Sequence, residues 1–130
     1  MKETLQPGIS GEVRERVVSK HLVSARDPQL MPVLATPWML GFMEHAAFDA
    51  IQPHLDDNEQ SVGVGFNFEH LAATPAGATV TAKATVLSID RRKVTFEIEA
   101  RDEHQVIGRG THVRAVVDIE RFKRRLRRTE

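Results

Sequence analysis

The segment that most constrains the fold is a long apolar stretch in the first half of the chain. Residues 38–51 carry ten apolar side chains among fourteen. Thr36 and Pro37 come directly before it, and a hydroxyl cap followed by proline at the first helical position predicts the start of a helix. We expect this helix to end near Pro53. Because a helix so apolar is buried on most of its sides, the rest of the chain must surround it.

Four segments after the helix alternate apolar and polar residues with the period of two that is typical of strands. They cover residues 61–70, 79–89, 93–101 and 106–118. Short turns join them, which favours antiparallel neighbours. Before the helix, residues 12–18 have the pattern of a partly exposed strand, and residues 20–35 contain two prolines and are expected to form a loop.

These elements predict the α+β class. A sheet with one apolar face must bury that face, and the helix is the large apolar partner available to it. We therefore predict a single domain over residues 1–130, in which a curved antiparallel β-sheet wraps around a long central α-helix. Residues 1–10 form a loose lead-in, and residues 119–130 form a basic C-terminal helix.

The composition excludes several classes of protein. Lys and Arg number 18 and Asp and Glu also number 18, so the formal net charge gives no general attraction to nucleic acid or anionic lipid. Cysteine is absent, which excludes disulfides, thiolate metal sites and a cysteine nucleophile and suits a reducing cytoplasm. No apolar run reaches the length of a membrane span. The histidines lack the spacing of a helical metal site, so no metal is expected.

One carboxylate falls among apolar side chains of the predicted helix. At about 100° per residue, Glu44 lies within about 40° of Pro37, Leu40, Phe48 and Ile51. An ionised carboxylate on an apolar face is costly unless a partner pairs with it, so Glu44 is a candidate site residue. The alternative is that Glu44 reaches the edge of the helix or hydrogen-bonds a neighbouring backbone group.

His70 raises the same question on the sheet, because it continues the apolar face of one predicted strand. The other members of that face are Val62, Val64, Phe66 and Phe68. If the face packs on the helix, we expect His70 and Glu44 to approach each other, within one chain or across a dimer, since a buried acid and a histidine satisfy each other's hydrogen bonds. Each is also compatible with a purely structural role, as is Thr36.

Three blocks of sequence carry a resemblance to a known family. They are Ala35–Glu44 (ATPWMLGFME), His70–Gly77 (HLAATPAG) and Ile107–Arg114 (IGRGTHVR). In content and in spacing the ordered set resembles the fluoroacetyl-CoA thioesterase family. The resemblance implies a hot-dog fold and a homodimer.

The resemblance also implies roles for particular residues. Thr36, Glu44 and His70 match the catalytic Thr, Glu and His of the family, and Gly63 and Arg114 match residues that contact the substrate. Leu30 occupies the place of a lid phenylalanine that recognises fluorine in the fluoroacetate-specific member. We therefore expect a short acyl-CoA rather than fluoroacetyl-CoA as substrate.

Hydrolysis of a thioester needs a nucleophile, a proton acceptor and donors for the developing oxyanion. We expect His70 to act as general base and acid, Glu44 to orient it or to attack as a carboxylate, and Thr36 to attack or to bind the substrate carbonyl. A covalent intermediate and direct attack by water both remain open. No cofactor is expected beyond the coenzyme A of the substrate.

Other functions fit parts of the same sequence. The first alternative is an acyl-CoA binder of the same fold without catalysis, and the second is a hydratase or dehydratase, for which no suitable Asp-x-x-x-x-His is found. The tail at 121–128 holds six basic residues in eight. It fits a solvated helix better than a nucleic-acid patch or a contact with CoA phosphates. His112 is expected to be a packed structural residue on the same strand face as Arg114.

Overall fold

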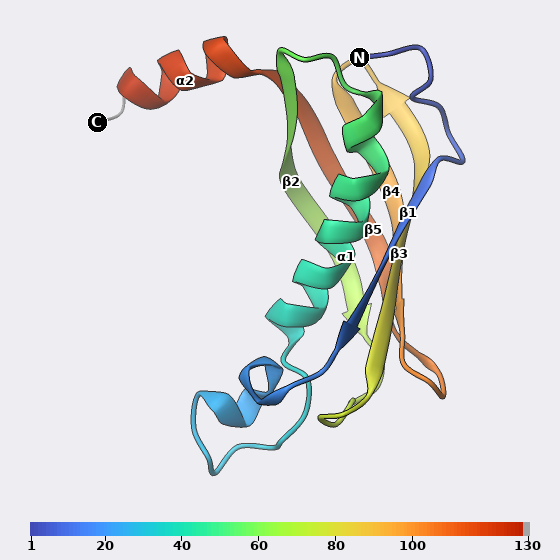
Figure 1. The fold of residues 1–130 in the computed structure, drawn as a ribbon, viewed down its shortest axis with the longest axis vertical. Helices are drawn as coiled ribbons and strands as arrows, with labels where there is room; N and C mark the ends of the chain where they lie inside the picture. The colour runs from blue at the N-terminus through green and yellow to red at the C-terminus, as the bar shows by residue number, and fades with distance from the viewer. Residues whose placement is uncertain (129–130) are drawn as a thin grey trace.

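The elements of the chain follow one another as a strand, a long helix, four strands and a terminal helix (Figure 1). The computed structural model describes residues 1–128. The main elements are β1 (Ser10–Arg16), α1 (Thr36–Ile51), β2 (Glu59–His70), β3 (Thr79–Asp90), β4 (Lys93–Arg101), β5 (Val106–Asp118) and α2 (Ile119–Arg128). Three single turns of 3-10 helix are η1 (Ser19–His21), η2 (Val23–Ala25) and η3 (Gln52–His54).

The five strands form one antiparallel sheet in the order β1-β3-β4-β5-β2. The sheet curves around α1, as Figure 1 shows. The predicted α+β arrangement of a curved sheet around a central helix is therefore confirmed. The predicted basic helix at the C-terminus corresponds to α2, and residues 129–130 of that segment lie outside the described residues.

Packing between α1 and the sheet depends on small and flexible side chains. Two fully buried methionines and three buried alanines of α1 face the sheet, where alanines and β-branched or aromatic residues cover the opposite surface. The helix members are Met39, Met43, Ala46, Ala47 and Ala50. Alanine lets the helix approach the strands closely and methionine fills the remaining gaps, which makes the central helix a rigid support for side chains on its margins.

The prediction of which β2 side chains share one face is wrong for the first half of the strand. The register of β2 against β5 shifts between Gly63 and Gly65, so Val64 forms a β-bulge. A bulge inserts one residue and reverses which side chains point to the helix. Phe66 and His70 therefore share a face with Ser61 and Gly63, and Val62 points to the other side of the sheet.

A buried carboxylate ties the start of β2 to two distant segments. Glu59 accepts hydrogen bonds from the Met1 ammonium at 2.5 Å, the Asp56 amide at 3.0 Å and the Arg92 guanidinium at 2.6 Å. Burial by itself raises the pKa of Glu59, but the ammonium, the amide and the guanidinium outweigh it and hold the pKa at about 2.

Glu59→Gln is expected to lower the free energy of unfolding at pH 7 by about 2–3 kcal/mol. The carboxylate has a lower pKa in the folded chain than the ordinary 4.5, so its stabilisation is complete above pH 4.5 and is lost as the pH falls through about 2. Urea unfolding of both proteins at pH 7 and pH 3 measures this. Glu97→Gln, at an exposed position of β4, is the matched control; equal losses in the two variants would contradict the assignment.

Candidate active site

A buried guanidinium stands at the centre of the first polar cluster. Arg114 of β5 is 5% exposed. Its Nε donates to Ser61 Oγ at 2.9 Å and its Nη2 to the Ser61 carbonyl at 3.1 Å. Its Nη1 lies 3.2 Å from both Glu44 Oε2 and His112 Nε2. Because Ser61 fixes one side of the planar group, the other side is aimed at the carboxylate of α1.

His112 holds that guanidinium from the side and is packed inside the protein, as predicted. Its Nδ1 lies 2.8 Å from the Gly65 carbonyl. A carbonyl only accepts hydrogen bonds, so Nδ1 carries the proton and Nε2 accepts from Arg114. Burial lowers the pKa of His112, which keeps the ring neutral at neutral pH. The Phe66 ring stacks on it with centroids 3.9 Å apart, and His112 is therefore a support for Arg114.

Gly63 makes room for the carboxylate. A Cβ at this position would overlap Glu44 Oε2 and would lie 3.2 Å from His112 Cε1. The close approach of Glu44 to the backbone of β2 therefore requires glycine here. The role of Gly63 in binding the acyl group, which the resemblance implies, stays a prediction.

The surroundings of Glu44 differ from those predicted. The buried side of α1 is centred on Met39, Met43 and Ala50, and Glu44 lies at its margin with a side chain that is 44% exposed. The helical wheel placed Glu44 wrongly because α1 also carries apolar residues on a side that is exposed in this chain. Phe48, next to Glu44 on that side, is 38% exposed.

The second cluster pairs a hydroxyl with an imidazole at the start of α1. Thr36 Oγ1 lies 2.8 Å from His70 Nδ1. The prediction that Thr36 caps the helix is wrong, because Ala35 occupies the cap position and makes no side-chain cap hydrogen bond. The Thr36 hydroxyl is directed to His70 instead. Within residues 1–128, the buried Nε2 of His70 has no hydrogen-bond partner.

The two clusters lie apart within one chain. Eight residues separate Thr36 from Glu44 along α1, or about 12 Å of helix rise. The imidazole near Glu44 is His112, with Nε2 at 3.9 Å from Oε2. The expected approach of Glu44 and His70 within a single chain is therefore wrong, and their approach across a dimer stays a prediction.

Leu30 lies 43% exposed on the loop between η2 and α1, and its contact with substrate also stays a prediction. A shallow pocket of about 370 Å³ opens beside His70. Its lining consists of Val33, Leu34, His70, Leu71, Ala72 and Ala73. The pocket places His70 beside a mainly apolar surface.

Sequence reasoning missed Ser61, which holds Arg114 through both its hydroxyl and its carbonyl. The available signal was a small polar residue two positions before Gly63, but the bulge at Val64 hid the face on which it lies. Among residues 1–128, no group of three potential ligands could hold a metal ion. No helix in the same range is long and apolar enough to cross a membrane.

The fold is similar to solved structures of the thioesterase superfamily. The structure of a Thermus thermophilus protein, described as a thioesterase superfamily member, is 25% identical and superposes with a TM-score of 0.91 over 98% of this chain and 94% of that one. The structure of the fluoroacetyl-CoA thioesterase FlK is 32% identical, with a TM-score of 0.90 over 98% of this chain and 99% of that one. The curved sheet and central helix are thus the hot-dog fold of the thioesterase superfamily, as predicted.

The amino-acid sequence is similar to one family within that superfamily. A family model described as "Fluoroacetyl-CoA-specific thioesterase" matches residues 17–120. The fluoroacetyl-CoA thioesterase of Streptantibioticus cattleyicolor is 41% identical over 95 residues, which cover 73% of this chain and 68% of that protein. The chain belongs to the fluoroacetyl-CoA-specific thioesterase family.

Proposed function

We propose that this protein hydrolyses a short acyl-CoA thioester to the free acid and coenzyme A. The observation that carries the proposal is the 2.8 Å contact between Thr36 Oγ1 and His70 Nδ1, beside a pocket and at a helix N-terminus. A hydroxyl donor leaves the His70 Nδ1 as proton acceptor, which is the arrangement a general base needs. Membership of a thioesterase family supports the same reaction.

A second copy of the chain is part of the proposal. β2 is an edge strand, and it carries two exposed apolar residues, Val64 at 53% and Phe66 at 37%. Phe48 adds an exposed ring from α1. An exposed apolar edge strand pairs readily with another strand. We therefore expect a homodimer in which two β2 strands run antiparallel across a two-fold axis.

The dimer would unite the two clusters. Antiparallel pairing carries the Glu44 of one subunit toward the partner's β2, on which His70 is the last residue. With Nδ1 accepting from Thr36, His70 Nε2 carries a proton and needs an acceptor. Glu44 retains its Oε1 for that purpose, since Oε2 faces Arg114. The proposed site therefore combines Thr36 and His70 of one subunit with Glu44 of the other.

The chemistry follows from these positions. His70 takes a proton from the attacking group, either the Thr36 hydroxyl or water, and returns it to the sulfur of the departing coenzyme A. Glu44 stabilises the imidazolium that forms in between, and the positive end of α1 favours the oxyanion. If Thr36 attacks, water hydrolyses the acyl-enzyme in a second step, with His70 taking the proton of that water. Attack by the Glu44 carboxylate brings no proton, so on that route coenzyme A leaves as the thiolate and water hydrolyses the anhydride. Gly63 and Arg114 hold Glu44, and we propose that they border the acyl group and that the reaction uses no cofactor beyond the coenzyme A of the substrate.

We propose a particular kind of acyl chain and a cellular location for this protein. Leu30 stands where a fluorine-recognising phenylalanine would be expected, so we propose a short, unfluorinated acyl chain. A cysteine-free sequence suits the reducing cytoplasm.

A thiol-release assay over acyl-CoAs from acetyl to long-chain tests the function. We expect turnover that is highest for short chains and weaker for fluoroacetyl-CoA than for the best unfluorinated substrate. Binding of acyl-CoA without release of thiol would favour the non-catalytic alternative and would overturn the proposal.

A further inference from the structure

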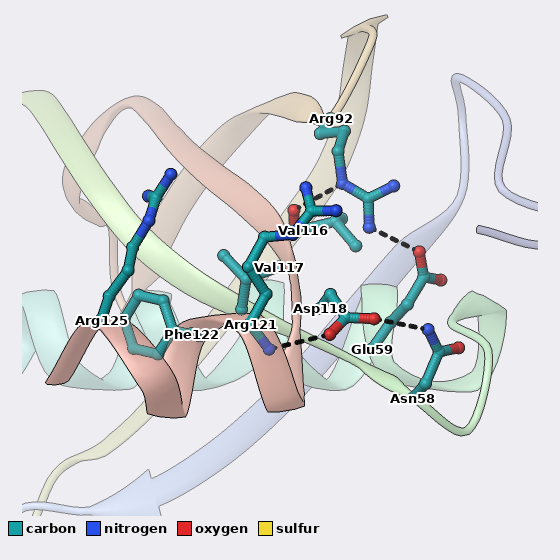
Figure 2. Close-up of a pocket in the computed structure, with 9 residues that line it drawn as sticks. All are labelled: Asn58, Glu59, Arg92, Val116, Val117, Asp118, Arg121, Phe122 and Arg125. Carbon is teal, nitrogen blue, oxygen red and sulfur yellow. Dashed lines mark hydrogen bonds and ion pairs between the residues drawn. The ribbon is translucent and has the colours of Figure 1, made fainter. Parts of the chain in front are cut away.

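A second cavity lies at the other end of β2, where α2 leaves the sheet (Figure 2). It has a volume of about 340 Å³, within the range of small-ligand pockets. Two arginines and a phenylalanine of α2 line one side, and Arg92 of the turn between β3 and β4 lines another. The α2 residues are Arg121, Phe122 and Arg125.

Two guanidinium groups of this cavity are free to bind an anion. Arg121 and Arg125 are four residues apart, on one face of α2, and both are exposed. Within residues 1–128, neither forms an ion pair with a carboxylate within 4.0 Å. Arg92 is already engaged, since it donates to Glu59 at 2.6 Å and to the Val116 carbonyl at 2.9 Å.

The two carboxylates of the cavity are also occupied. Glu59 accepts from Arg92 and from the N-terminal ammonium. Asp118 accepts from the Asn58 side chain at 2.9 Å and from the Arg121 amide at 3.0 Å. Asp118 keeps its negative charge and attracts the Arg121 guanidinium, but the lining holds three arginines against two carboxylates, so the cavity is net cationic. Phe122, half-buried between the two arginines along the helix, adds an apolar ring.

We propose that this cavity binds the 3′-phosphoadenosine diphosphate end of the acyl-CoA substrate. Guanidinium groups bind phosphate oxygens in pairs of parallel hydrogen bonds, so Arg121 and Arg125 suit the phosphate groups. Phe122 offers a face on which the adenine can stack. The α2 residues that would contact the nucleotide lie beyond residue 120, where the family match ends.

The position of the cavity fits the partner's catalytic cluster and not its own. Glu59 and His70 are the two ends of β2, which separates the cavity from its own His70 by about 36 Å of extended strand. In an antiparallel pair of β2 strands, the Glu59 end of one subunit lies beside the His70 end of the other. Figure 1 shows α2 extending away from the sheet on the side of β2. This inference rests on the proposed function and dimer: α2 of one subunit holds the nucleotide whose thioester reacts in the other.

Titration calorimetry of the full-length protein with coenzyme A tests the subsite without requiring catalysis. Arg121→Ala/Arg125→Ala is expected to weaken binding at least about tenfold. Arg124→Ala/Arg127→Ala removes the same charge from the same helix at residues that do not line the cavity, and it should change affinity less than about twofold. Dephospho-CoA should bind wild type more weakly than coenzyme A does. Equal losses in the two double variants, or no loss in the first, would overturn the proposal.

Hydrolysis of acyl-CoA and of the matching acyl-pantetheine, which lacks the nucleotide, gives a second readout. Arg121→Ala/Arg125→Ala is expected to raise KM for acyl-CoA about tenfold with kcat unchanged, and to leave acyl-pantetheine kinetics as in wild type. Losing both activities equally would contradict a nucleotide subsite. Coenzyme A binding that depends on Arg121 and Arg125 in a protein without turnover would reject the proposed function and keep the subsite. A variant that loses affinity for a DNA or RNA oligonucleotide but not for coenzyme A would reject the subsite in favour of nucleic-acid binding.

Discussion

Replacing His70 with alanine is expected to lower kcat/KM for the best acyl-CoA about a thousandfold, with most of the loss in kcat. The imidazole contacts the Thr36 hydroxyl at 2.8 Å and is the proposed carrier of the proton from the attacking group to the leaving sulfur. Without it, the hydroxyl or water must attack without a base, and the thiolate must leave unprotonated. Steady-state thiol release at several substrate concentrations separates the effects on kcat and KM.

Variants at Thr36 test whether the Thr36 hydroxyl and the His70 imidazole act as a unit. Thr36→Ser keeps the hydroxyl and is expected to stay within about tenfold of wild type, whereas Thr36→Ala should approach the His70→Ala rate. If the two groups act as a unit, the double variant is barely slower than either single variant. His104→Ala, at an exposed turn position, is the control for loss of a histidine. Turnover by His70→Ala within tenfold of wild type would remove His70 from the mechanism.

The secondary structure could be predicted well because its signals are local. The predicted strands 93–101 and 106–118 match β4 and β5 residue for residue, since regular alternation and polar turns define their ends. Pro37 and Pro53 bracket α1 in the same way, although the helix ends at Ile51 and continues as a 3-10 turn. β1 begins two residues earlier than predicted, because charged residues at an edge strand weaken the alternation.

The sequence suggested candidate residues for the site but not the contacts that they make. Thr36, Glu44 and His70 were candidates, but their partners depend on tertiary contacts. The bulge at Val64 changes the face of β2, and its local signal is the pair of glycines that flank it, Gly63 and Gly65. It brings Ser61 and Gly63 to the same side as Arg114, and this strand pairing determines that Glu44 meets Arg114 instead of His70.

The failure of the helical wheel at Glu44 is itself informative. A helix that packed on one sheet alone would need a single apolar side, and α1 instead has ten apolar residues among the fourteen at 38–51. The sheet uses the side of Met39 and Met43, while Phe48 remains exposed next to Glu44. An apolar surface beside a carboxylate, continued by Val64 and Phe66 on an edge strand, is what a subunit interface requires.

Mixed dimers are expected to regain activity that neither parent has. Homodimers of Glu44→Gln and of His70→Ala should each be nearly inactive. In a dimer with one chain of each kind, one site receives both substitutions and the other receives native Glu44 and native His70. If these residues act across the interface, the mixed dimer recovers about half of the wild-type kcat per dimer, a gain of about two orders of magnitude over either parent. Co-expression with two affinity tags isolates this species for assay.

The reciprocal dimer supplies the control. One chain carries both substitutions and the other is wild type. If the sites are shared between subunits, one site then lacks His70 and the other lacks Glu44, so both stay inactive. A site built within one subunit gives the opposite pair of results, with the reciprocal dimer half active and the first mixed dimer inactive. The two pairs of results differ because Glu44 and His70 occupy separate clusters of one chain, and the proposed dimer would bring Glu44 of one subunit to His70 of the other. Half of the wild-type activity in the reciprocal dimer would therefore show that each active site lies within one subunit, and it would contradict the shared site.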